Sequence, residues 1–307
     1  MQGFLRTRDG RLERWDGRGR PEPGSLAWLS LRAGEERALL PLLAAFGLGR
    51  FAELALGEWR HPVGQVAQDA LALVLETVPE SWEGRRTYLF LLLTPEVLAS
   101  VVPEGYAAVD DLEARPEEAL ADGLDYLVFR LLTPLLDGYE ARSEALVARA
   151  EALEGAVLHG RHRLYTEIFL ARREALQLRR VIEPELDVLA LLVDHRFHGR
   201  AADSPYFHDL FRRLRRIAKE VESVRDGLSA MVESYASVVA NELNQVMKFL
   251  TVLSTVFLPA TLIASIYGMN FKIPEYSWPH GYAYSLGLMV AVSGLLVAYI
   301  AAKGWFR

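Results

Sequence analysis

Residues 249–271 read FLTVLSTVFLPATLIASIYGMNF, a stretch that lies between Lys248 and Lys272 and contains no charged side chain. A helix needs about 20 consecutive apolar residues to cross the hydrocarbon core of a bilayer. The polar tripeptide Gly268-Met269-Asn270 stands at the end of this stretch, where a membrane helix would emerge into water. The pattern therefore predicts a spanning helix that carries a polar amide at its mouth.

A second uncharged stretch covers residues 282–302 and is also long enough to span a bilayer. The linker at 268–281 is short and contains two prolines, so we expect the two spans to form a hairpin. Aromatic residues near the linker are typical of a membrane–water interface: Tyr267, Tyr276, Trp278, Tyr282 and Tyr284. The alternative interpretation is a pair of buried core helices in a soluble protein.

Both termini are expected on the cytoplasmic side of the cell (inner) membrane. The residues from Met1 to Arg6 lack the apolar core of a signal peptide. An even number of spans returns the chain to the side on which it started. The tail at 303–307 carries two cations, in agreement with the positive-inside rule, although Lys272 on the other side weakens the charge argument.

The composition restricts the possible functions. The chain has 307 residues, of which 51% are hydrophobic and 24% charged, and the charges concentrate in the first 240 or so residues. A net charge of −6 argues against nucleic acid as a main partner. The absence of cysteine excludes a disulfide framework, a thiolate metal site and a cysteine nucleophile.

Residues 1–115 are predicted to form an α+β cytoplasmic domain with the layers of an α/β/α sandwich. Asp9-Gly10 between two short β-leaning runs is a strong hairpin signal. Further apolar or β-leaning runs predict strands at 26–31, 70–78 and 87–94, and intervening segments predict helices at 34–46 and 51–56.

Residues 116–204 change to helical character, with long helices expected at 117–158 and 163–196. Pro134 and Pro184 are possible interruptions. The next helix is expected to start at Asp203-Ser204-Pro205, where an acceptor side chain precedes a proline in the first turn. It would run through a stalk at 205–248 into the first span at 249–267, a length of about 90 Å.

A stripe of mostly small polar residues follows one face of the first span, with recurrences every three or four positions. Its members are Asn244, Met247, Thr251, Ser254, Leu258, Thr261 and Ser265. One interpretation is close packing between membrane helices. The other is a pore lining in which Met247, Leu250 and Leu258 are constrictions that dewet and close. A pore would require an oligomer, because a two-helix hairpin cannot enclose one.

The segment from Asn244-Gln245-Val246-Met247-Lys248 through Pro259 to Tyr267-Gly268-Met269-Asn270-Phe271 closely resembles the CorA family of divalent-cation channels. The resemblance continues through the second span to the basic tail, and Ser204-Pro205-Tyr206-Phe207-His208-Asp209 resembles the start of that family's stalk helix. It implies a homopentameric funnel that transports Mg²⁺, with Co²⁺ and Ni²⁺ as further possible ions. It also implies gating by cytoplasmic Mg²⁺, and it requires no organic cofactor.

The resemblance assigns roles to particular residues. The selectivity filter would comprise Gly268, Met269 and Asn270, and the pore or gate would comprise Asn244, Met247, Leu250, Leu258 and Thr261. Asp209 matches an acidic position of a regulatory metal site between subunits, with Glu76 or Glu80 as its possible partner. The family's loop commonly reads Met-Pro-Glu-Leu, whereas this chain has Ile273-Pro274-Glu275-Tyr276 and keeps the acidic residue that attracts cations.

The physical chemistry of Mg²⁺ agrees with these roles. Mg²⁺ loses its water reluctantly, so a ring of amide oxygens that binds the hydrated ion is a feasible filter. The negative C-terminal end of the first span's helix dipole also favours a cation. Neither span contains Asp, Glu, Lys or Arg, which favours a channel driven by membrane potential over a proton-coupled carrier.

Three alternative functions compete with a Mg²⁺ channel. Zn²⁺ transport, as in the ZntB branch, would use histidines such as His159, His162, His195, His198 and His208, although solvated histidines at helix ends are the simpler interpretation. A membrane-anchored scaffold would have no use for the tripeptide. An enzyme is not indicated, because the sequence has no phosphate loop, nucleophile elbow or His-Glu-x-x-His helix.

Overall fold

The computed structural model describes residues 1–67, 69–78, 84, 86–158, 164–194 and 204–304. It divides into two compact units, Met1–Val232 and Glu233–Arg307. One helix of 63 residues, α7 (Pro205–Tyr267), contributes to both units. At a rise of 1.5 Å per residue this helix is about 95 Å long.

The described part of the first unit contains a seven-stranded sheet with the order β2-β1-β3-β7-β6-β5-β4. The strands are β1 (Gln2–Arg6), β2 (Leu12–Arg14), β3 (Leu26–Arg32), β4 (Val63–Ala67), β5 (Ala70–Glu76), β6 (Tyr88–Leu93) and β7 (Val97–Val102). Only the central β3–β7 pair among these is parallel. The strands β5, β6 and β7 are buried along their whole length, as expected for a sheet covered on both faces.

Helices cover both faces of the sheet and form three layers. Alternate residues of β5 point to opposite faces, so Leu73 and Val74 belong to different hydrophobic clusters. One face packs on a 3-10 turn, η1 (Glu36–Leu39), and on the short helices α1 (Leu40–Ala45) and α2 (Ala52–Leu56), near a second such turn, η2 (Gly49–Phe51). The other face packs on α3 (Ala107–Ala114), α4 (Pro116–Ala119), α5 (Leu124–Leu158), α6 (Tyr165–Val193) and the start of α7.

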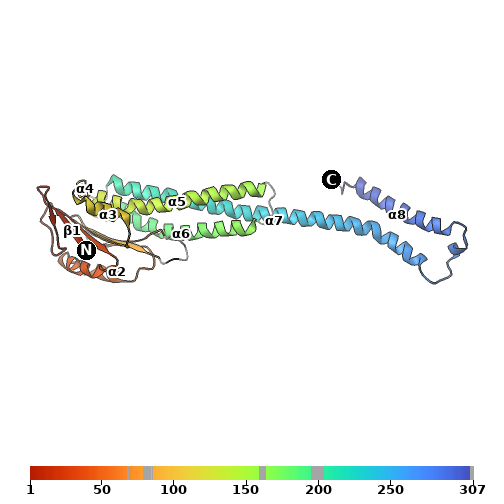
Figure 1. The fold of residues 1–307 in the computed structure, drawn as a ribbon, viewed down its shortest axis with the longest axis horizontal. Coiled ribbons are helices and arrows are strands. Elements are labelled where there is room, and N and C mark those ends of the chain that lie inside the picture. The colour runs from red at the N-terminus through yellow and green to blue at the C-terminus, as the bar shows by residue number, and fades with distance from the viewer. Residues whose placement is uncertain (68, 79–83, 85, 159–163, 195–203, 305–307) are drawn as a thin grey trace. The chain divides into compact units, whose positions relative to one another are not determined.

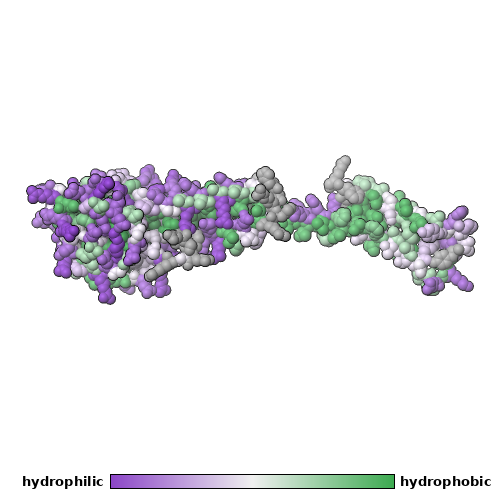
Figure 2. Space-filling view, in the orientation of Figure 1, coloured by the Kyte–Doolittle hydropathy of each residue, from purple (hydrophilic) through white to green (hydrophobic). Residues whose placement is uncertain are grey.

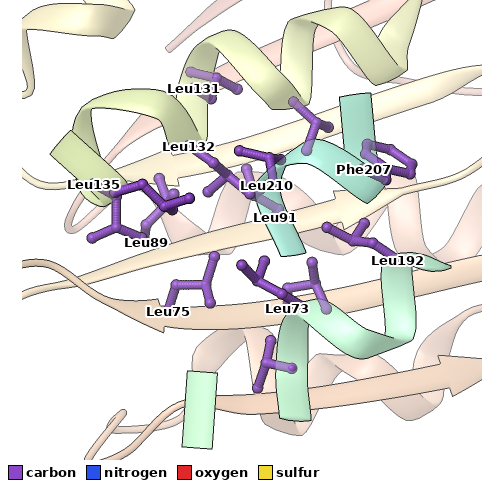
Figure 3. Close-up of a cluster of buried hydrophobic side chains, with 14 of the residues drawn as sticks. Leu73, Leu75, Leu89, Leu91, Leu131, Leu132, Leu135, Leu192, Phe207 and Leu210 are labelled. Atoms are coloured by element: carbon purple, nitrogen blue, oxygen red, sulfur yellow. The ribbon is translucent and has the colours of Figure 1, made fainter. Parts of the chain in front are cut away.

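The larger cluster joins these helices to the sheet through leucine side chains. Figure 3 shows Leu73 and Leu91 from the strands facing Leu132 from α5 and Leu210 from α7. All four are at most 1% exposed. The packing buries the first turns of α7 within the first unit.

Polar contacts fix the start of α7 on α5. The Ser204 hydroxyl donates a hydrogen bond to Oδ2 of Asp125 at 2.6 Å, and Pro205 is the first helical residue. Two turns later, Arg213 forms ion pairs with Asp137 and Glu140 of α5. Asp203, the first residue of the expected start signal, lies outside the described residues.

Several expected elements differ from those observed. The Asp9-Gly10 hairpin is present, and Gly10 has a positive φ of 81°. Strands β4 and β7 were not expected from the sequence. The expected helix at 34–46 is a 3-10 turn followed by the six-residue α1. Pro134 and Pro184 lie inside continuous helices and do not interrupt them.

The second unit contains the rest of α7, a 3-10 turn η3 (Pro274–Ser277) and α8 (Gly281–Ala302), which form a helical hairpin (Figure 1). The Ser293 hydroxyl of α8 donates a hydrogen bond to the carbonyl oxygen of Val256 in α7 at 3.2 Å. The most apolar 18-residue window of α7 has no buried residue, and that of α8 is 11% buried. Figure 2 shows hydrophobic residues at the surface of the hairpin formed by α7 and α8. These helices are therefore candidate membrane spans and not core helices of the described fold.

Candidate functional site

One face of α7 in the second unit is partly covered by α8, whose Ser293 hydroxyl donates to the Val256 carbonyl of that face. Val252, Val256, Pro259, Ile263 and Tyr267 are partly buried and recur every three or four residues. On α8, the partly or fully buried residues Ser285, Met289, Val292, Leu296 and Ile300 recur in the same way. The contact between the two spans therefore uses one stripe on each helix.

The polar stripe of α7 lies on a different face, which the described residues leave exposed. Asn244, Met247, Thr251, Ser254, Leu258, Thr261 and Ser265 are all exposed, as is Leu250. At about 100° per residue, the centre of this stripe lies roughly 155° around the helix from the face that α8 covers. Packing between the two spans of one chain therefore does not account for the stripe.

The hydroxyl groups of the stripe are oriented by the helix itself. Those of Thr251, Thr261 and Ser265 donate to the carbonyl oxygens of Met247, Phe257 and Thr261 at 2.7, 2.8 and 2.8 Å. Each hydroxyl proton is thus engaged, and the lone pairs of its oxygen remain available as acceptors. These hydroxyl oxygens can therefore accept hydrogen bonds from water.

The tripeptide begins where the α-helix ends. The Gly268 N–H donates to the Ala264 carbonyl at 2.9 Å and the Met269 N–H to the Ile266 carbonyl at 3.2 Å. Asn270 follows these last turns and is exposed. A Cβ atom added to Gly268 would lie 3.2 Å from the Ala264 oxygen, which is tight for such a contact. Glycine therefore lets the chain turn closely against the end of α7.

The loop after the tripeptide forms a defined turn next to it. Glu275 in η3 is partly exposed, and Trp278 packs edge-on against Tyr284 with 5.6 Å between ring centroids. A cavity of about 570 Å³ has Gly268, Glu275 and Gly281 in its walls. The acidic residue of the loop and the first residue of the tripeptide thus border the same space.

The two described acidic residues of the expected regulatory site have separate partners. Asp209 is exposed in the second turn of α7 and lies 3.4 Å from the Arg212 guanidinium. Glu76 is 1% exposed at the end of β5, where its carboxylate lies 3.3 Å from the Arg86 guanidinium. Burial raises the pKa of Glu76, and the charge of Arg86 opposes this shift.

Part of the expected ligand set is not described. Glu80 and the histidines His159, His162, His195 and His198 lie outside the described residues. Within the described ranges, no group of three or more His, Asp or Glu side chains is arranged to hold a metal ion. His208 is exposed on α7.

Two residues of α8 contact the backbone of another element in ways that the sequence did not predict. Gly281 opens α8 in close contact with the backbone of η3, and Ser293 binds the backbone of α7. A glycine at the start of a helix and a serine inside a span are both common. Their local sequence therefore carried no signal for these contacts.

Comparison with known proteins agrees with this architecture. The model of the family described as "CorA-like Mg2+ transporter protein" matches residues 23–302. The chain belongs to the CorA family. The predicted order of a soluble α/β domain, a long helix and two candidate transmembrane helices is confirmed, since it also matches a full-length CorA structure.

Three similar proteins illustrate the CorA relationship. The putative metal ion transporter YfjQ of Bacillus subtilis is 35% identical over 208 residues, which is 66% of this chain and 65% of YfjQ. The cobalt/magnesium transport protein CorA of Thermotoga maritima is 35% identical over 184 residues, 59% of this chain and 52% of that protein. The matched region thus spans about half to two thirds of these relatives. The CorA magnesium transporter structure from Methanocaldococcus jannaschii has a TM-score of 0.74 at 21% identity and covers 99% of each chain, a likeness of fold.

Proposed function

We propose that this protein transports Mg²⁺ across the cell membrane through a homopentameric channel lined by α7. The observation that supports this most directly is the exposed polar stripe of α7, which leads to the tripeptide and lies away from the α8-covered face. The CorA magnesium and cobalt transporters among its relatives favour the same class of cargo. Co²⁺ and Ni²⁺ are further candidate ions.

In this proposal, five copies of α7 surround the pathway and the α8 helices form an outer ring. The acceptor lone pairs of Thr251 and Thr261 would then face the lumen and bind the water shell of the ion. Met247, Leu250 and Leu258 would be the apolar constrictions that close the pathway when they lose water. The exposed apolar surface of the hairpin would contact the lipid bilayer and neighbouring subunits.

Gly268, Met269 and Asn270 would form the selectivity filter. A ring of Asn270 amides can accept hydrogen bonds from hydrated Mg²⁺ without stripping the water that this ion holds tightly. Glu275 borders the same cavity as Gly268 and would raise the local concentration of cations. The open carbonyl groups at the C-terminal end of α7 add to this attraction.

The N- and C-termini would be cytoplasmic, with the first unit as the sensor of cytoplasmic Mg²⁺. Asp209 is exposed and acidic, so it is available to bridge a metal ion to a neighbouring subunit. Glu76 is buried and paired with Arg86, so we do not assign it this partner role. Loss of the bridging metal would leave the acidic groups of neighbouring subunits to repel one another and favour opening.

Flux measurements on the purified protein in lipid vesicles test the proposal. With an inside-negative potential, we expect Mg²⁺ uptake that Asn270→Ala abolishes and that Mg²⁺ on the cytoplasmic side suppresses. Asn241→Ala is the matched control, because Asn241 is an exposed asparagine of α7 that lies off the stripe. Absence of Mg²⁺ uptake, or full uptake by Asn270→Ala, would refute the channel and favour a membrane-anchored scaffold.

Competition between ions separates Mg²⁺ from Zn²⁺ transport as in the ZntB branch. Equal concentrations of Mg²⁺, Co²⁺, Ni²⁺ and Zn²⁺ are offered to the same vesicles. We expect Mg²⁺ to compete effectively with Co²⁺ and Ni²⁺. Preferential uptake of Zn²⁺ that excess Mg²⁺ fails to reduce would support the alternative.

A further inference from the structure

We propose that Gly281 is a positioning residue, which holds the Glu275 carboxylate at the mouth of the filter through a direct backbone contact. This inference rests on the proposed function, because it concerns how the loop serves the filter. Gly281 is the first residue of α8, and Glu275 lies in η3, six positions earlier.

The contact leaves no room for a side chain at Gly281. A Cβ atom there would lie 2.2 Å from the carbonyl oxygen of Glu275 and 3.3 Å from its carbonyl carbon. The obstructing atoms belong to the main chain, so no rotation of a side chain can relieve the clash. Any larger residue would have to displace η3 from the start of α8.

Hydrogen bonds close the same turn from both sides. The Glu275 carbonyl accepts from the Trp278 N–H at 3.2 Å, and the Trp278 carbonyl accepts from the Gly281 N–H at 3.2 Å. The Ser277 hydroxyl donates to the Pro274 carbonyl at 2.7 Å. The position of Glu275 is therefore tied to the first turn of α8.

This tie matters because Glu275 carries the only carboxylate between the two spans. Glu275, Gly268 and Gly281 all border the cavity of about 570 Å³ beside the tripeptide. The attraction between a carboxylate and an arriving cation depends inversely on their separation. A shift of η3 would thus weaken cation capture while the filter residues themselves stay unchanged.

The test compares alanine substitutions at three glycines of α8 in the flux assay. Gly281→Ala introduces the clash, whereas Gly287→Ala and Gly294→Ala add a methyl group that has no atom within 4 Å outside the adjacent backbone of α8. We expect Gly281→Ala to raise the half-saturating Mg²⁺ concentration about threefold or more, with the maximal flux retained. The two control variants should match the wild type.

A double-mutant cycle with Glu275→Gln identifies the route of the effect. If Gly281 acts by placing the carboxylate, Gly281→Ala should have little further effect once Glu275→Gln has removed the charge. Fully additive effects, or a Gly281→Ala variant that behaves like the Gly287→Ala control, would overturn the inference. If the wild type itself carries no Mg²⁺, the proposed function fails instead.

A second variant covers the case in which Gly281→Ala does not assemble. Pro279→Gly loosens the turn between Glu275 and Gly281 without adding an atom beside the Glu275 carbonyl. We expect the same increase in half-saturating concentration, and again only while Glu275 is present. An unchanged value in the assembled Pro279→Gly protein would count against the inference.

Discussion

The hydroxyl of Tyr139 on α5 lies 2.9 Å from Oε1 of Glu185 on α6 and 2.6 Å from the carbonyl oxygen of Glu76 on β5. Tyrosine has one proton, so it cannot donate to both oxygens. We infer that Glu185 is protonated, which resolves the conflict: its Oε1 hydroxyl donates to Tyr139 while still accepting from the Glu76 N–H at 2.8 Å, and Tyr139 then donates to the Glu76 carbonyl. Glu185 is fully buried, and this burial raises the pKa of its carboxyl well above the ordinary value.

Glu185→Gln should therefore change how stability depends on pH. If the native protein keeps a proton on Glu185 that the unfolded chain releases above about pH 4.3, the free energy of unfolding falls as pH rises. Replacing the carboxyl of Glu185 by an amide abolishes this decrease in the free energy of unfolding. Relative to wild type, the variant should gain up to about 1.4 kcal/mol per pH unit until the native carboxyl ionises.

Unfolding of the full-length protein in detergent at about pH 5 and about pH 8 measures this difference. In the Glu185→Gln variant the free energy of unfolding still falls somewhat with rising pH, because burial also raises the pKa of Glu76. Parallel pH profiles for the variant and the wild type would show that Glu185 is ionised in the native protein.

Ser100→Ala should lower the free energy of unfolding by about 1–3 kcal/mol. The indole N–H of Trp28 on β3 donates to the Ser100 hydroxyl on β7 at 3.0 Å, and both residues are at most 1% exposed. The substitution leaves a buried donor without its acceptor. Thermal unfolding of Ser100→Ala, Trp28→Phe and the double variant measures this. The double variant should lose less free energy of unfolding than the two single variants lose together.

Leu258→Ser should increase Mg²⁺ leak through the closed channel. The hydroxyl makes the proposed constriction easier to wet. Leu253→Ser is the matched control, since Leu253 is an exposed leucine of α7 about 140° around the helix from Leu258. Vesicle flux at high cytoplasmic Mg²⁺ gives the measurement, and equal leak in both variants would contradict a pore-facing Leu258.

Mg²⁺ should raise the unfolding temperature of the wild-type protein, and Asp209→Asn should reduce that increase. A ligand that binds only the native state stabilises it by about 2.7 kcal/mol at 100 times its Kd. Asp226→Asn is the control, because Asp226 is another exposed acid of α7, paired with Arg225. A Mg²⁺-dependent shift of the same size in Asp209→Asn would exclude Asp209 from the regulatory site.

The strand predictions succeeded where local sequence was sufficient and failed where it was not. The leucine-rich β5 and β6 were expected because continuous apolar runs mark buried strands. β4 was missed because Gly64 and Gln65 weaken its local signal. Gly64 is explained by packing, since a Cβ atom there would lie 2.3 Å from the Leu191 side chain of α6. β7 follows β6 after the tight turn at Thr94; the predicted strand ended at Thr94 and no strand was predicted for 97–102.

By itself, the sequence determined the two spans, the long helix entering the first of them, and the polar tripeptide between them. These features follow from hydropathy, charge and helical period, which are properties of neighbouring residues. The tertiary structure decided which face of α7 lies under α8, that Glu185 shares Tyr139 with β5, and that Gly281 touches the carbonyl of Glu275. Each of these depends on backbone and side-chain atoms from separate elements meeting within a few ångströms, and no local pattern specifies such a meeting.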